Sequence, residues 1–393
     1  MSRGRLFGTL CGAVFLVNMA RVVFAPLLSE FIAVFDLTAG TAGLLATMAW
    51  VGSAALRVPT GWLLTRWPRH YVVLGAGALL TVAASFIAAA NSLAMLMVGA
   101  VGMGLASGAY FVAANPLVSE LFPNRVGRLL GIHGTASQLA AVAAAPLVTV
   151  VLATNWRLFG ADRWRVVFVG MALAAATVTV VLFFSARSAT LPDAGAADRD
   201  LLGAARAEWR TILTGVAILG GVGLLWQGVF NFYELYMGTK SVPPVLERNL
   251  LTVIFAAGVP AFLVSGRLAD RFPHVPYLLS IVAGFVLALF GLIVSEGIVQ
   301  VLLASAVLGY VVHSLFPAMD TYMLDTLPDE TRGSAYAVYS GTMMFVQAGG
   351  SWVVGELRDL GFAFDAVFSA GGVGVGLLLA VLVLLSRTGK LPE

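Results

Sequence analysis

Between Tyr71 and Ser119 the sequence contains no charged residue, and most side chains in this stretch are apolar. A helix needs about 20 apolar residues to cross the hydrocarbon core of a bilayer, so the stretch is long enough for two crossings. The mean hydropathy of the whole chain is +0.93, and 60% of its residues are hydrophobic. These values exclude a soluble protein and predict a polytopic membrane protein.

The apolar segments divide the chain into twelve predicted spans separated by short loops. The alternating segments of about ten residues that build a membrane β-barrel do not occur, so we expect the spans to be helices and the fold to be all-α. The predicted spans are 6–28, 40–64, 71–90, 93–120, 129–153, 165–185, 211–237, 249–268, 276–294, 298–324, 333–355 and 364–385.

The basic residues in the loops indicate the orientation of the chain. Most of the 23 Lys and Arg residues lie in loops on the same side as the two termini. Short loops rich in Lys and Arg stay in the cytoplasm, so both termini are predicted to be cytoplasmic. The bases are too thinly scattered to form a nucleic-acid surface, and a single cysteine, Cys11, cannot form an internal disulfide.

One long hydrophilic segment divides the spans into six and six. We therefore predict an N-terminal six-helix bundle over 1–186, a cytoplasmic loop over 187–210 and a C-terminal six-helix bundle over 211–393. With six spans each, the two halves share one orientation. Transporter folds built from repeats place the substrate site near the middle of the membrane, between the repeats.

The second half repeats landmarks of the first. Most recur 205 residues later, and an asparagine on the first span has a counterpart on the seventh. The repeated pairs are Gly61 and Gly266, Arg66 and Arg271, Glu120 and Asp325, and Asn18 and Asn231. Internal duplication of this kind is typical of transporters.

The loop that begins at Gly266, "GRLADRF", carries a recognisable pattern. Its Gly266, Asp270 and Arg271 match the loop between spans two and three that is the signature of the major facilitator superfamily. The first copy keeps Gly61 and Arg66 but has a threonine in place of the aspartate. The chain thus resembles this superfamily along its whole length, which implies two pseudo-symmetric bundles around a central cavity and transport by alternating access.

The resemblance also implies a role for the loop charges. Asp270 is expected to face the N-terminus of span five, where unpaired N–H groups and the helix dipole attract a carboxylate. Arg271 is expected to pair with Asp325, and Arg66 with Glu120. Together with the two signature glycines, these contacts would close the cytoplasmic gate. The alternative is that the charges only end the helices and bias their orientation.

Arg21 lies deep within the first span, where an ionisable side chain is costly and marks a candidate site. In the superfamily the first span lines the cavity, so we expect Arg21 and Asn18, three residues earlier, to contact substrate or a gate. The alternative is that Arg21 is structural and extends its charge to the membrane interface. On span seven the matching residues are Asn231 and Glu234. Glu234 is expected either to pair with Arg21 across the cavity or to pair with Lys240 near the outer surface.

His313 and Asp320 lie seven residues apart on span ten, and therefore on one helical face. They could form a proton relay, with Glu234 as a further proton-coupling candidate, or they could be a hydrogen-bonded packing pair. Other polar residues in spans either contact substrate or bind neighbouring helices together. These weaker candidates for substrate contact are Tyr110, Asn115, Gln138, Gln227, Asn231, Tyr233 and Gln347.

Glycines spaced four residues apart allow helices to approach closely. Two such pairs lie within spans, Gly104 with Gly108 and Gly8 with Gly12. We expect both pairs to be helix contacts.

The motifs of the main enzyme classes do not occur in the sequence: there is no zinc-binding HExxH, no GxSxG and no P-loop. We therefore expect no catalysis, no metal and no cofactor. The predicted function is secondary transport of a small solute across the cell membrane, with a small organic anion as substrate and proton coupling. The alternatives are efflux of amphipathic drug-like compounds, or a non-transporting receptor or lipid translocator. The predicted partners are the substrate, protons and membrane lipids, with the protein acting as a monomer.

Overall fold

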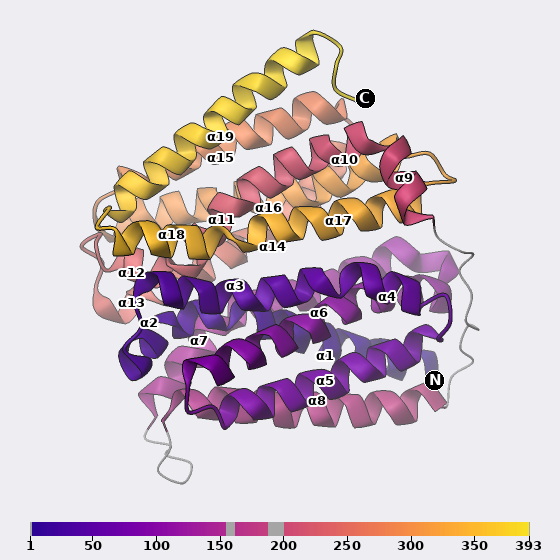
Figure 1. Cartoon of the computed structure of the whole chain (residues 1–393), viewed down its shortest axis with the longest axis horizontal. Coiled ribbons are helices and arrows are strands. Elements are labelled where there is room, and N and C mark those ends of the chain that lie inside the picture. Colours follow the sequence, from indigo (N-terminus) through magenta and orange to yellow (C-terminus); the bar gives the residue numbers. More distant parts are fainter. Residues whose placement is uncertain (1, 155–161, 188–199, 393) are drawn as a thin grey trace. The chain divides into compact units, whose positions relative to one another are not determined.

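The computed structural model describes residues 2–154, 162–187 and 200–392, and within these ranges the elements are helical, with no strand (Figure 1). The central part of the predicted cytoplasmic loop, 188–199, lies outside the described residues. The helices before it are α1 (Ser2–Val22), α2 (Phe24–Phe35), α3 (Ala39–Ala55), α4 (Arg57–Leu63), α5 (Arg69–Ala88), α6 (Leu93–Leu121), η1 (Pro123–Arg125), α7 (Val126–Ala153) and α8 (Trp164–Arg187).

The second part of the chain continues with helices of similar length, interrupted by several short ones. They are α9 (Leu201–Ala207), α10 (Trp209–Gly215), the π-helical η3 (Val216–Gly220), α11 (Gly221–Asn231), α12 (Tyr233–Met237), α13 (Pro244–Glu247), α14 (Leu250–Ala269), α15 (His274–Ile293), α16 (Gly297–Thr326), α17 (Arg332–Ala348), α18 (Gly350–Asp359) and α19 (Phe364–Arg387). The chain forms two compact units. The first contains Met1–Asp36 and Met48–Arg199, and the second Leu37–Thr47 and Asp200–Glu393.

The observed helices coincide with the predicted spans, so the all-α membrane fold is confirmed. Eleven helical segments of the described chain are long and apolar enough to cross a membrane. The remaining predicted span, 333–355, is α17 followed by α18, with Gly349 between them. The count of twelve and the cytoplasmic position of the termini stay predictions, as does the division into bundles at 186 and 211.

Glycines allow close contacts between helices in both units. A Cβ atom at Gly104 in α6 would lie 2.0 Å from the carbonyl oxygen of Ala49 in α3. A Cβ atom at Gly309 in α16 would lie 2.3 Å from the carbonyl oxygen of Ile254 in α14. Both members of the second contact lie 205 residues after those of the first, so the internal repeat predicted from the sequence extends to backbone packing.

The other predicted glycine contacts have mixed outcomes. Gly108 continues the α3–α6 contact, since a Cβ atom there would lie 2.3 Å from the carbonyl oxygen of Ser53. Gly8 has no atom within 4 Å of the position of a Cβ, so the prediction for this residue is wrong. Gly12 has only an ordinary contact with the side chain of Val178.

The acidic residues that end α6 and α16 pair differently from the prediction. Glu120 binds Arg69, at 2.6 Å, rather than Arg66, and Arg66 lies over the ring of Trp62. Asp325 binds His274, at 3.3 Å, rather than Arg271. Arg69 and His274 are again 205 residues apart, and each follows the proline that precedes α5 or α15.

The physical reason for this correction is the position of each charge on its helix. Arg69 and His274 begin α5 and α15, where the helix dipole disfavours a cation, and the acids lie in the last turns of α6 and α16, where it disfavours an anion. Pairing the two charges offsets both penalties. Arg66 and Arg271 lie in the loops before the helices and carry no such penalty.

The two pairs should differ in strength. Glu120→Gln should lower the free energy of unfolding by about 1 kcal/mol, because Arg69 is 14% exposed and keeps its charge. Asp325→Asn should cost less, because Asp325 is 62% exposed and His274 is charged only when protonated. Thermal unfolding of the two purified variants beside wild type measures this difference. Equal losses of unfolding free energy would show that neither the exposure of the paired side chains nor the charge of the base decides the strength of the pair.

Within the second unit, the start of α3 packs against α18. The carboxylate of Asp359 accepts hydrogen bonds from the backbone N–H groups of Ala39 (2.9 Å) and Gly40 (2.8 Å). These are N–H groups that an α-helix cannot satisfy itself. The pKa of Asp359 is lowered, since burial acts to raise it but the hydrogen bonds outweigh burial. Asp359 therefore caps α3 from α18.

Candidate functional site

Arg21 contacts two aromatic rings in the first unit. Its side chain is 8% exposed and projects from the last turn of α1. The guanidinium carbon lies 4.8 Å from the ring centre of Trp50 in α3 and 4.7 Å from that of Phe111 in α6. Cation–π contacts at these distances stabilise a desolvated guanidinium.

Asn18 fixes the orientation of this guanidinium. Its side-chain oxygen accepts a hydrogen bond from Nη2 of Arg21 at 2.5 Å, and its side-chain nitrogen donates to the carbonyl oxygen of Ser137 in α7 at 2.7 Å. Asn18 is thus a bridge between α1 and α7 and a support for Arg21. Both predicted residues of span one lie together, as the three-residue spacing indicates.

Several buried hydrogen-bond donors of the first unit have no partner among the described residues, and one of them is on Arg21 itself. In the described part of the chain, Nε of Arg21, Nε1 of Trp50 and Nε2 of Gln138 are buried without a hydrogen-bond partner. The charge of Arg57 that acts on Arg21 is also positive. Because buried polar groups are normally satisfied, unsatisfied donors on a buried cation and on the tryptophan that contacts it are unusual. They are suited to a ligand that brings acceptor atoms and negative charge.

Tyr110 lies outside this donor cluster. Its hydroxyl group donates to the carbonyl oxygen of Leu10 at 2.6 Å and lies 3.0 Å from Nε2 of His133. Tyr110 and His133 are both almost fully buried, so they join α1, α6 and α7. Substrate contact by Tyr110 loses support. Asn115, another candidate, is exposed on α6.

In the second unit, Asn231 has the same bridging role as Asn18. Its side-chain nitrogen donates to Oγ of Ser351 in α18 at 2.8 Å and to Gln227 in its own helix. The repeated asparagines therefore both tie the first helix of a half to the fifth. Gln347 packs against Gly223, where a Cβ atom would lie 2.6 Å from its side-chain oxygen. Helix-to-helix binding accounts for the contacts of these three candidates.

One of the two predicted partners of Glu234 needs correction. Glu234 accepts hydrogen bonds from Nη2 (2.7 Å) and Nε (3.1 Å) of Arg248. Lys240 pairs instead with Asp365, at 3.0 Å, so the predicted Glu234–Lys240 pair is wrong. Arg248 precedes α14 and lies beside α12, which explains why a bidentate pair forms within this unit. Pairing of Glu234 with Arg21, in the other unit, would first require breaking this pair.

His313 and Asp320 have different surroundings despite their shared helical face. His313 is buried, with Nδ1 2.7 Å from the carbonyl oxygen of Gly309 and its ring next to those of Trp226 and Phe255. Asp320 is exposed and accepts a hydrogen bond from Tyr336 at 2.7 Å. A direct relay between them therefore loses support. The hydroxyl group of Tyr233, another candidate, binds Oγ of Ser305 in α16.

The sequence analysis missed the two rings that contact Arg21. Trp50 and Phe111 lie in apolar spans, where an aromatic residue is normally predicted only to pack against neighbouring helices or lipid. It also missed Arg69 and His274, although the 205-residue repeat that relates Glu120 to Asp325 relates these two residues as well. That repeat was a signal that could have identified them.

The family comparison decides what kind of protein carries this site. The model of the Major Facilitator Superfamily matches residues 10–351 and, in a second match, 249–392. The chain belongs to the major facilitator superfamily. It is accordingly a multi-pass transporter of the cell membrane, and its resemblance in the loops at Gly61 and Gly266 is confirmed at the level of the family. No curated protein matches the chain by sequence.

Solved structures of superfamily transporters share the fold at low identity. A bacterial homolog of the human lysosomal transporter Spinster, inward-facing and occupied, is 16% identical with a TM-score of 0.80, over 98% of this chain and 97% of that one. A D-xylose–proton symporter is 14% identical with a TM-score of 0.79, over 95% and 96%. The xylose transporter XylE from E. coli is 14% identical with a TM-score of 0.78, over 96% and 94%. At these identities the likeness is one of fold alone.

Proposed function

We propose that this superfamily member carries a small organic anion by alternating access, and that Arg21 is the residue that binds it. The observation that supports this substrate class is the buried guanidinium of Arg21, whose hydrogen-bond partner in the described chain is the neutral Asn18. A charge in a membrane span is expensive, at roughly 2.5–3.5 kcal/mol on insertion scales. A bound carboxylate would offset that cost.

The geometry of the cluster favours an anion over a neutral solute. The edge of Arg21 presents Nε, and Trp50, which contacts the guanidinium, offers a further N–H group that has no acceptor in the described chain. An arginine edge binds a carboxylate through two parallel hydrogen bonds. A neutral sugar would bring donors as well as acceptors and would leave the cation without a counter-charge.

Amphipathic drug-like compounds are the second candidate substrate class. Their binding sites need open aromatic faces, and the faces of Trp50 and Phe111 that meet Arg21 are already covered by the guanidinium. This contact makes the rings part of the anion site, and it is the reason we rank drug efflux second.

Proton coupling and the cytoplasmic gate remain predictions. His313 keeps its place as the buried titratable candidate of the second unit. The contact of Asp270 with the start of span five would join residues of the two units. It belongs to the proposed transport cycle.

A ligand screen on the purified protein tests the proposed substrate class. Mono- and dicarboxylates should raise the unfolding temperature in a concentration-dependent manner, because a ligand that binds only the folded protein stabilises it. Xylose and a lipophilic cation serve as neutral and cationic comparisons. If the lipophilic cation alone stabilises the protein, drug efflux replaces anion transport as the proposed function.

A further inference from the structure

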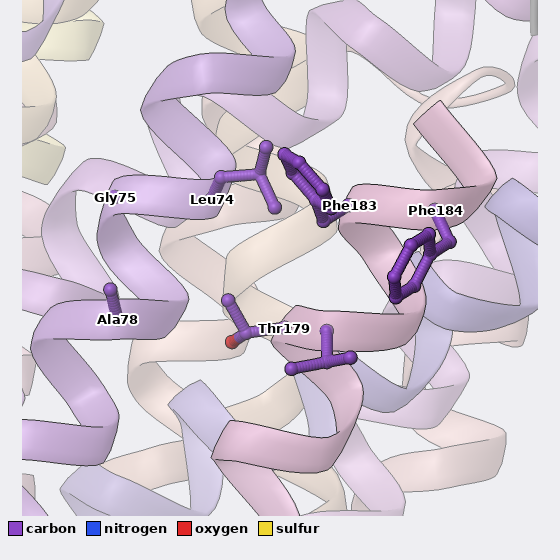
Figure 2. Close-up of a pocket in the computed structure, with 7 residues that line it drawn as sticks. Leu74, Gly75, Ala78, Thr179, Phe183 and Phe184 are labelled. Atoms are coloured by element: carbon purple, nitrogen blue, oxygen red, sulfur yellow. The ribbon is translucent and has the colours of Figure 1, made fainter. Parts of the chain in front are cut away.

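An open apolar groove lies between α5 and α8 in the first unit. Its volume is about 520 Å³, within the 300–1,000 Å³ range of small-molecule sites. It is lined by Leu74, Gly75, Ala78, Thr179, Val180, Phe183 and Phe184. In Figure 2 the side chain of Leu74, from α5, points toward Phe183, from α8. The lining is apolar except for one threonine, as expected of a surface that meets hydrocarbon.

Gly75 and Gly77 produce the groove. A Cβ atom at Gly77 would lie 2.2 Å from Oγ1 of Thr179, so the two helices touch at this point. A Cβ atom at Gly75 would have nothing within 4 Å. The two helices are therefore in contact at Gly77. Two residues earlier, Gly75 leaves a space that no side chain of the described chain fills.

The groove lies at one end of the unit. Its α5 residues fall within about three turns of Arg69, which begins the helix, and its α8 residues within about three turns of Arg187, which ends it. That end also carries the N-terminus, where Arg3 donates to the carbonyl oxygen of Leu121 (Figure 1). Loops rich in basic residues meet the cytoplasmic leaflet, so the groove opens at the depth of that leaflet.

A cation stands at the mouth of the groove. Arg187 is exposed, and its guanidinium carbon lies 4.2 Å from the ring centre of Phe183, one of the lining residues. A basic side chain beside an apolar groove at the membrane surface matches a molecule with an anionic headgroup and a hydrocarbon tail. The cytoplasmic leaflet supplies such molecules as anionic phospholipids.

We propose that this groove binds one anionic phospholipid of the cytoplasmic leaflet, with an acyl chain against Gly75 and Ala78 and the phosphate at Arg187. The site is separate from Arg21 and does not depend on the proposed substrate. Bulk lipid covers every apolar face of a membrane protein. This groove differs because it combines an unfilled space at Gly75 with the positive charge of Arg187, which favours a lipid with an anionic headgroup over a neutral one.

Two substitutions address the two parts of the site. Gly75→Leu fills the groove, and because a Cβ atom there meets nothing, the variant should fold. Arg187→Gln removes the headgroup contact and should weaken binding about fivefold, the equivalent of about 1 kcal/mol for one basic residue at the surface.

The chain offers a matched control for each variant. Gly170→Leu places the same side chain on the exposed surface of α8 at another open position, away from the groove. Arg210→Gln removes another arginine that lies over an exposed aromatic ring, Trp209, in the second unit. Size-exclusion profiles and unfolding temperatures establish that all four variants are folded.

Native mass spectrometry of delipidated protein with dioleoylphosphatidylglycerol, and separately with dioleoylphosphatidylcholine, provides the test. One phosphatidylglycerol should remain bound to wild type, Gly170→Leu and Arg210→Gln at concentrations where Gly75→Leu has lost it and Arg187→Gln binds it about fivefold more weakly. Phosphatidylcholine should show no such retained molecule. The proposal is overturned if Gly75→Leu retains the lipid as wild type does, if the two arginine variants behave alike, or if both lipids are retained equally.

Discussion

Replacing Arg21 with alanine should abolish anion uptake into vesicles that contain the purified protein. The guanidinium is the anchor in the proposed site, and charge-assisted hydrogen bonds to a buried anion contribute about 1.5–3 kcal/mol each. Losing one or two of them should weaken anion binding from about tenfold to well over a hundredfold. Arg21→Lys should fail nearly as completely, because an ammonium group cannot present two parallel N–H groups to a carboxylate.

The control for this result is Arg165→Ala. Arg165 belongs to the same unit, stacks on a tryptophan at 4.5 Å and is 18% exposed, but it pairs with Asp162 and binds the carbonyl oxygen of Ala88. Its loss should lower stability without changing anion affinity. If the alanine variant of Arg21 transports anions at the wild-type rate once expression is matched, Arg21 is structural and the proposed substrate class is wrong.

Substituting valine at Gly104 or at Gly309 should sharply reduce the yield of folded protein. Each Cβ atom would lie 2.0–2.3 Å from a backbone carbonyl oxygen, and a backbone cannot move aside as a flexible side chain can. Overpacking of a close helix contact costs about 1–3 kcal/mol or more. Because the two contacts are equivalent in the two halves, the losses should be similar. Monodisperse yield and unfolding temperature measure them.

Gly170 is the matched position for this experiment as well. A Cβ atom there has nothing within 4 Å, so Gly170→Val should leave the yield unchanged, and Gly170→Ala should be neutral or slightly stabilising because alanine favours a helix. A wild-type yield from either of the two substituted contact glycines would show that the helices can separate at little cost. The repeat would then describe sequence similarity without a packing requirement.

Much of the fold could be predicted because membrane spans follow from local composition. The start of α6 at Leu93 and its end near Glu120 agree with the predicted span to within one residue. The ion pairs were harder, because Arg66 and Arg69 are both close enough in sequence to reach Glu120. What separates them is the position of Arg69 at a helix N-terminus, which depends on where α5 begins.

The site was only partly predictable for a different reason. A single arginine in an apolar span can be recognised as a candidate site residue from the sequence. The three-residue spacing then places Asn18 on the same face of the helix. The rings of Trp50 and Phe111 come from two other helices, and only their packing brings them to Arg21. Glu234 shows the converse, since Arg248, its partner, lies in a loop whose path the sequence does not define.

The break between α17 and α18 has a consequence for how the protein is made. This pair is not among the helices of the described chain that are apolar enough to cross a membrane by themselves, and it buries polar residues such as Gln347 and Ser351. Ser351 donates to the carbonyl oxygen of Gln227 in α11, a helix that the ribosome completes more than a hundred residues earlier. We therefore expect insertion of this segment into the membrane to depend on its contact with α11, a helix that is made earlier.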